Sequence, residues 1–140
     1  METIICYVGG EARGNPGAAA IGVLVVDGGG VVITEIGKSI GNANGNFAEY
    51  YAVMVGLQTL QTLYGELTHD MHFELRLSNE SVKRQLAAQA TINEPGLVPM
   101  FIEIHNMRVE SFPNLALTLV TPEENKEVQQ LVNEALDGKR

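Results

Sequence analysis

The sequence has little cysteine, few aspartates and no long apolar run. Its one cysteine, Cys6, cannot close an internal disulfide, and its apolar surroundings favour a buried structural thiol over a reactive one. A single unpaired cysteine is typical of a reducing compartment, so we expect a cytoplasmic protein. No apolar stretch approaches the roughly 18 residues of a membrane helix, and the N-terminus lacks the pattern of a secretory signal. The chain also holds only three aspartates, Asp27, Asp70 and Asp137.

Positive charge is scarce as well. Nine lysines and arginines face seventeen acidic residues, which gives a formal net charge of −8. Proteins that follow a phosphate backbone usually carry a clustered basic stripe, but only Lys83–Arg84 and Lys139–Arg140 are adjacent pairs here. Residues 85–97 contain no lysine or arginine. We therefore expect any binding of nucleic acid to be weak and strongly dependent on salt.

The chain does contain the pattern of one α/β domain over residues 1–140. Runs of β-branched and aromatic residues predict strands, and apolar residues at helical spacing predict helices. Residues 10–17 are expected to form a loop, Asn46 to cap the first helix and Gly65 to end it. Short loops between the first three strands predict an antiparallel meander in a mixed five-stranded sheet covered by helices. The expected strands are 2–9, 18–26, 31–38, 72–78 and 115–121, and the expected helices are 46–62, 80–88, 97–112 and 122–137.

Three segments carry a resemblance to a known family. Residues 7–17 read YVGGEARGNPG, residues 46–50 read NFAEY, and residues 120–136 read VTPEENKEVQQLVNEAL. In this order they resemble the type 1 ribonuclease H proteins of bacteria and archaea, and the resemblance covers nearly the whole chain. It implies an RNase H-like fold, with the meander followed by parallel strands and flanked by helices. It also implies hydrolysis of the RNA strand of an RNA–DNA hybrid, with two Mg²⁺ ions held by four carboxylates.

Carrying those four carboxylate positions over to this sequence changes the expectation. Glu49 is retained, whereas the other three positions hold Gly9, Asn79 and Gln129. One carboxylate cannot offset the dehydration of one Mg²⁺ ion, still less the repulsion between two. We therefore expect a pseudoenzyme that is catalytically inactive and needs no cofactor.

Two acidic residues leave alternatives open. Glu49 is either a remaining metal ligand or an acid that the helix dipole favours in a first turn. Glu11 lies two residues after Gly9, so in a continuing strand it faces the same side. Glu11 and Glu49 could then form a relocated site for Mg²⁺ or Mn²⁺, although metal sites tolerate little misplacement.

The expected nucleic-acid contacts are also open to two interpretations. The resemblance implies that Gly14, Asn15 and Gly17 contact 2′-hydroxyl groups in the minor groove of the hybrid, and Asn46 is a further candidate for binding it. Gly-Asn-Pro-Gly is equally sufficient as a simple turn between two strands. Arg13 could pair with a phosphate, but an isolated arginine is usually a solvated surface residue.

Three functions follow, in order of preference. The first is binding or scaffolding for an unknown protein partner, reached through a sheet edge or an apolar helix face. The second is binding of an RNA–DNA hybrid without cleavage. The third is a metal-dependent ribonuclease H with a relocated carboxylate site.

Overall fold

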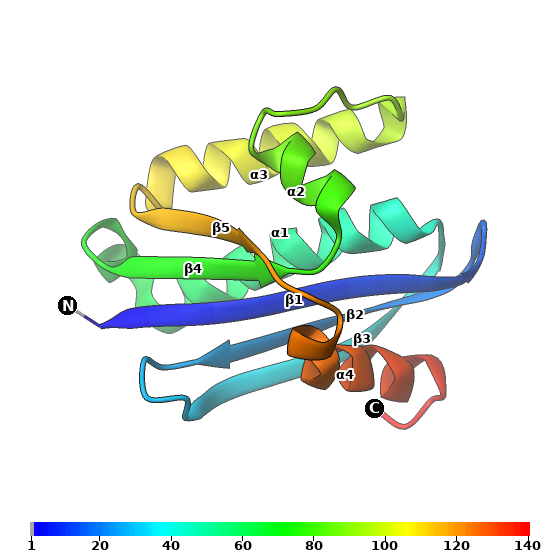
Figure 1. Cartoon of the computed structure of the whole chain (residues 1–140), viewed down its shortest axis with the longest axis horizontal. Coiled ribbons are helices and arrows are strands. Elements are labelled where there is room, and N and C mark those ends of the chain that lie inside the picture. The colour runs from blue at the N-terminus through cyan, green and yellow to red at the C-terminus, as the bar shows by residue number, and fades with distance from the viewer. Residues whose placement is uncertain (1) are drawn as a thin grey trace.

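The computed structural model describes residues 2–140, so Met1 of the predicted domain lies outside the described residues. Five strands form one sheet in the order β3-β2-β1-β4-β5 (Figure 1). The first three strands are antiparallel neighbours, while β4 runs parallel to β1 and β5 runs parallel to β4. The strands are β1 (Thr3–Gly14), β2 (Gly17–Val26), β3 (Val32–Ala43), β4 (His72–Leu77) and β5 (Leu115–Leu119).

Helices cover both faces of this sheet (Figure 1). The helix α1 (Gly45–Tyr64) packs on one face, and α2 (Glu80–Leu86) and α3 (Val98–Ser111) join it in one apolar core. The helix α4 (Lys126–Leu136) covers the other face of β1, β2 and β3. Within residues 2–140, no helix combines the length and the apolar character that crossing a bilayer requires.

Alternation along the strands creates two separate cores. Cys6 and Val8 of β1 face α1, whereas Leu24 of β2 faces α4 and packs with Val128. Successive side chains of a strand point to opposite faces, so β1 and β2 hold both layers of helices. Burial raises the pKa of the Cys6 thiol to about 12, in agreement with the structural role expected for it.

The first strand is longer than the sequence predicts. The loop expected over residues 10–17 is wrong, because β1 continues to Gly14 and the turn consists of Asn15 and Pro16. The glycines of this segment look like loop residues, but pairing with β2 is continuous to Gly17. Ladder pairing overrides local propensity here, and it also extends β3 to Ala43.

The start of α1 also differs from the prediction. The N-cap is Asn44 and not Asn46: the Asn44 Oδ1 atom accepts a hydrogen bond from the Phe47 N–H at 2.8 Å. Asn46 lies inside the first turn, where its side chain donates a hydrogen bond to Glu94 instead of capping the helix. Gly65 ends the helix as predicted, with a positive φ of 55°. The last helix begins at Lys126, after a short 3₁₀ turn over Glu123–Asn125.

Candidate functional site

The candidate site lies where β1 passes between the start of α1 and the start of α4. Gly10 permits this approach, because a Cβ atom at that position would overlap the backbone carbonyl of Ala48. The start of α1 therefore rests directly on β1, and Glu49 faces the strand. Glu49 lies beyond the first turn of α1, so its interpretation as a first-turn acid favoured by the helix dipole is wrong. The backbone N–H of Gly10 in turn donates a hydrogen bond to the Glu49 carboxylate.

Glu49 is in an environment that disfavours its charge. Its Oε2 atom is buried and makes no hydrogen bond within the described part of the chain. Burial raises the pKa of Glu49 to about 7, the Glu11 carboxylate adds to the rise, and the Gly10 hydrogen bond opposes it. The raised pKa makes the neutral form of Glu49 more favourable near neutral pH than that of an ordinary glutamate.

The space beside Gly9 is filled from α4. A Cβ atom at Gly9 would lie 2.9 Å from Val128 Cγ1 and 3.5 Å from Asn125 Nδ2. Val128 is fully buried, and the Asn125 amide is held by a 3.0 Å hydrogen bond to the Val8 carbonyl. A side chain at position 9 therefore requires the Val128 methyl group to move.

The other two substituted positions are engaged in local hydrogen bonds. Asn79 caps α2, because its Oδ1 atom accepts from the Val82 N–H at 3.0 Å. Gln129 on α4 donates from Nε2 to Glu11 Oε2 at 2.9 Å. β1 continues beyond Gly9, so Glu11 faces the same side of the sheet as Gly9, as the relocated metal site would require. The Glu11 carboxylate, however, accepts the hydrogen bond from Gln129.

These residues do not fit the pair of Mg²⁺ ions that the resemblance implies. Magnesium needs several charged oxygens in near-ideal octahedral geometry. Across residues 2–140, no group of three or more His, Cys, Asp or Glu side chains is placed to hold a metal ion. The family positions offer one carboxyl group with a raised pKa, two neutral amides, and a glycine against which Val128 packs.

A polar hollow of about 440 Å³ lies at the start of α1 and contains two of the predicted nucleic-acid residues, Asn15 and Asn46. It also contains Glu94, which the sequence analysis did not identify. Asn46 Nδ2 donates to Glu94 Oε1 at 2.7 Å, and Asn44 Nδ2 lies 3.4 Å from Glu94 Oε2. Glu94 is separated from Asn46 by 48 positions, and its place between Asn93 and Pro95 marks only a chain break.

Arg13 and Gly14 do not line this hollow. Arg13 forms a 2.8 Å ion pair with Asp137 beyond the end of α4, and both side chains are largely exposed. Exposed ion pairs of this kind contribute little to stability, so Arg13 can exchange Asp137 for another anion at low cost. Gly14 ends β1 with a φ of 122°, a conformation that favours glycine.

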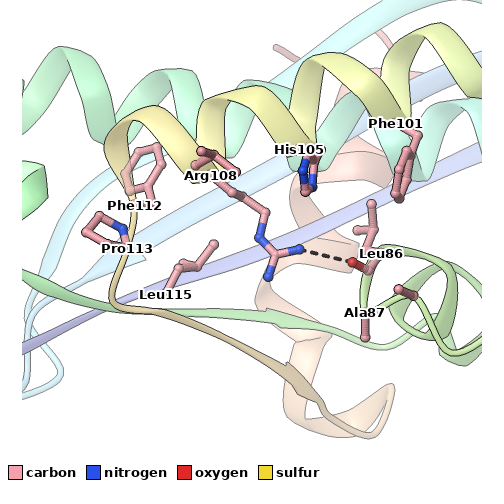
Figure 2. A pocket seen from close by; sticks show the side chains of 10 residues that line it. Leu86, Ala87, Phe101, His105, Arg108, Phe112, Pro113 and Leu115 are labelled. Carbon is pink, nitrogen blue, oxygen red and sulfur yellow. Dashed lines mark hydrogen bonds between the residues drawn. The ribbon is translucent and has the colours of Figure 1, made fainter.

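A separate apolar pocket opens between α3, the end of α2 and β5 (Figure 2). Its volume is about 530 Å³, and Arg108 reaches into it and donates from Nη1 to the Leu86 carbonyl at 3.0 Å. Burial lowers the pKa of Arg108, and no carboxylate within residues 2–140 forms an ion pair with it. β5 is an edge strand of the sheet, so within residues 2–140 no further strand pairs with its outer side.

Comparison with known sequences identifies relatives over nearly the whole chain. A family model described as Reverse transcriptase-like matches residues 8–135. Ribonuclease HI of Halobacterium salinarum is 34% identical over 134 residues, which are 94% of this chain and 63% of that protein. A mycobacterial relative, Bifunctional protein Rv2228c of Mycobacterium tuberculosis, is 24% identical over 96% of this chain and 36% of its own length. The chain thus spans less than two thirds of these curated relatives.

Solved structures match the chain over its full extent. LC11-RNase H1, isolated from compost by a metagenomic approach, is 38% identical with a TM-score of 0.94, over 99% of this chain and 98% of that one. The same protein in complex with an RNA/DNA hybrid gives a TM-score of 0.91 over 96% and 97% of the two chains. RNase H1 from the archaeon Halobacterium salinarum is 32% identical with a TM-score of 0.88, over 97% and 98%. The shared architecture confirms the predicted α/β fold and its mixed sheet.

Proposed function

Because this chain belongs to the ribonuclease H family, we propose that it binds RNA–DNA hybrids without cutting them efficiently. Retained binding is supported by Asn15 and Asn46, which share one hollow, and by a 38% identical relative that was solved with a hybrid. The loss of cleavage rests on one observation. Of the four family carboxylate positions only Glu49 is acidic, and its pKa is raised to about 7 by burial.

Binding of this kind depends more on hydrogen bonds than on charge. The net charge of −8 opposes a phosphate backbone, while asparagine side chains can recognise 2′-hydroxyl groups of the RNA strand. Arg13 can leave its exposed ion pair with Asp137 and contact a phosphate. Affinity for the hybrid is therefore low, and few counterions are released on binding.

A titration of the chain with a fluorescent hybrid tests the proposal. Anisotropy should give a micromolar dissociation constant at low salt, with a slope of log affinity against log salt of about −1 to −2. The shallow slope follows from neutralising one or two phosphates. Gels of the same samples in Mg²⁺ should show intact RNA.

Asn46→Ala should weaken binding of the hybrid, whereas Asn114→Ala, which removes an exposed amide beside β5, should not. Absence of binding at tens of micromolar protein would reject the proposal.

Scaffolding for a protein partner is the second candidate function. The observation that favours it is the apolar pocket beside the open edge of β5, where the Arg108 guanidinium is partly buried without a carboxylate partner. An extended segment of a partner could add to β5 and place an acidic or apolar side chain in the pocket.

This second function predicts a specific cross-linking result. A photo-reactive residue in place of the exposed Val109 should capture one defined protein in cells, and Arg108→Ala should abolish the capture. Affinity for the hybrid should be unchanged by either substitution, because the pocket and the asparagine hollow share no residue. Equal capture with and without Arg108 would count against docking at this pocket.

A relocated ribonuclease H site at Glu11 and Glu49 is the third hypothesis, and the hydrogen bond between Glu11 and Gln129 weighs against it. The absence of a cofactor and the cytoplasmic location stay predictions, as does the extent of the domain over residues 1–140.

A further inference from the structure

We infer that Glu94 is a specificity-determining residue that makes the asparagine hollow favour ribose over deoxyribose. The inference rests on the proposed binding of RNA–DNA hybrids and assigns to that site a residue from a distant segment. Its basis is the pair of amide contacts at 2.7 and 3.4 Å between the Glu94 carboxylate and the side chains of Asn46 and Asn44.

These contacts decide which hydrogen-bonding groups the hollow offers. The Nδ2 groups of Asn44 and Asn46 are both directed to Glu94, and the Asn44 Oδ1 atom accepts from the Phe47 N–H. On the Glu94 side of the hollow, the side-chain groups left for a ligand are the Asn46 Oδ1 atom and the remaining lone pairs of the Glu94 carboxylate, both of which are acceptors. Asn15, which also lines the hollow, adds an amide that can donate. The Glu94 side of the hollow is thus rich in acceptors and negatively charged.

A nucleic-acid backbone presents only one donor to such a surface. Phosphate oxygens are anionic acceptors, and the deoxyribose of DNA has no hydroxyl at the 2′ position. The 2′-hydroxyl of RNA can donate, and a hydrogen bond to a carboxylate is about twice as strong as one between neutral groups. Glu94 repels the phosphates of both kinds of strand, but only a ribose offers it a 2′-hydroxyl donor that offsets this repulsion.

Glu94 is held at this position by the fold. It directly precedes a 3₁₀ turn over Pro95–Leu97, and Leu97 is 2% exposed in the core shared with α1. The buried Leu97 thus fixes the backbone that follows Glu94, and the amides of Asn44 and Asn46 hold its carboxylate. A preorganised acceptor loses less conformational entropy on binding than a mobile one.

The test compares an RNA–DNA hybrid with a DNA duplex of the same sequence. Wild type, Glu94→Ala, Glu94→Gln and the matched control Glu103→Ala are titrated by anisotropy at one low salt concentration. Glu103 is an exposed acid on α3 outside the hollow. Glu94→Ala is expected to lower the ratio of hybrid to DNA affinity about 10-fold, by weakening the hybrid and strengthening the DNA. Glu94→Gln keeps an acceptor without the charge and should give an intermediate ratio, and Glu103→Ala should leave the ratio unchanged.

The other outcomes separate the inference from the proposed function. Equal changes on both duplexes would mean that Glu94 only supports the Asn44 cap, and would overturn the inference alone. A wild-type chain that binds neither duplex would overturn the proposed function and the inference with it. Thermal melting verifies that each variant folds. If Glu94→Ala does not fold, the near-isosteric Glu94→Gln becomes the deciding variant. A ratio of hybrid to DNA affinity that equals the wild-type ratio in Glu94→Gln would contradict a role for the charge.

Discussion

Cleavage of an RNA–DNA hybrid by the natural chain is expected to be at least about 10⁴-fold slower than by Ribonuclease HI of Halobacterium salinarum under the same conditions. The reason is electrostatic. Gly9, Asn79 and Gln129 supply no charge at three of the four family positions, and burial raises the pKa of the Glu49 carboxyl to about 7. A factor of 10⁴ corresponds to about 5 kcal/mol of lost transition-state stabilisation.

The measurement is a single-turnover assay with a labelled hybrid in Mg²⁺ and in Mn²⁺. Glu49→Ala serves as the control, since cleavage that survives this substitution comes from a contaminating nuclease. A natural chain that matches the archaeal enzyme, and loses its activity in Glu49→Ala, would establish a working site that uses other ligands. Glu11 would then be the first residue to substitute.

Restoring the carboxylates tests the same argument in the opposite direction. The combination of Gly9→Asp, Asn79→Asp and Gln129→Asp with Val128→Ala should raise cleavage at least about 100-fold above the natural chain. The same combination with Val128 retained should gain less, because Cγ1 of Val128 lies 2.9 Å from a Cβ atom at position 9. Equal rates with and without Val128→Ala would contradict the steric part of the argument.

Replacing Glu49 with glutamine is expected to stabilise the fold at neutral and alkaline pH. The pKa of Glu49 is about 7 in the folded chain against an ordinary value of 4.5, so the folded state holds the proton more tightly. The stability that protonated Glu49 contributes is complete below pH 4.5 and is lost as the pH rises through 7. The shift corresponds to a loss of at most about 3 kcal/mol. Glutamine resembles the neutral acid and does not titrate.

Denaturant unfolding at pH 4, 6 and 8 measures this effect. The difference between Glu49→Gln and the natural chain should be small at pH 4 and should grow with pH. Glu103→Gln, on the exposed side of α3, is the matched control and should show no such trend. A difference that is constant across the three pH values would show that Glu49 is not desolvated in the folded state.

Much of the architecture follows from local sequence patterns. Phe73, Leu75 and Leu77 alternate along β4 and are buried as that period requires. The sequence also suffices to locate the three family positions at Gly9, Asn79 and Gln129, because each lies within or beside a short recognisable motif. The limits of β1 do not, since the residues beyond Gly9 gain their extended conformation from pairing with β2.

The chemistry of the site depends on contacts between distant residues, which local patterns do not encode. The sequence left open whether Glu49 is a metal ligand or an acid favoured by the helix dipole, and it gave no sign that burial between α1 and β1 raises the pKa of Glu49. Glu94 carries no motif, and its contact with Asn46 joins two segments 48 positions apart, beside a turn that ends in the buried Leu97. Val128 belongs to the apolar stripe of α4, and its proximity to Gly9 appears only when α4 is packed on the sheet.

The valine beside Gly9 has a consequence for the substitutions that this chain tolerates. An aspartate introduced at position 9 by a single substitution would meet the Val128 methyl group and strain the packing of α4 on the sheet. Shortening Val128 would make room for that side chain, at the expense of apolar contacts that hold α4 on the sheet. Positions 9 and 128 are therefore coupled, and an acid at position 9 is expected to be tolerated best beside a smaller residue at position 128.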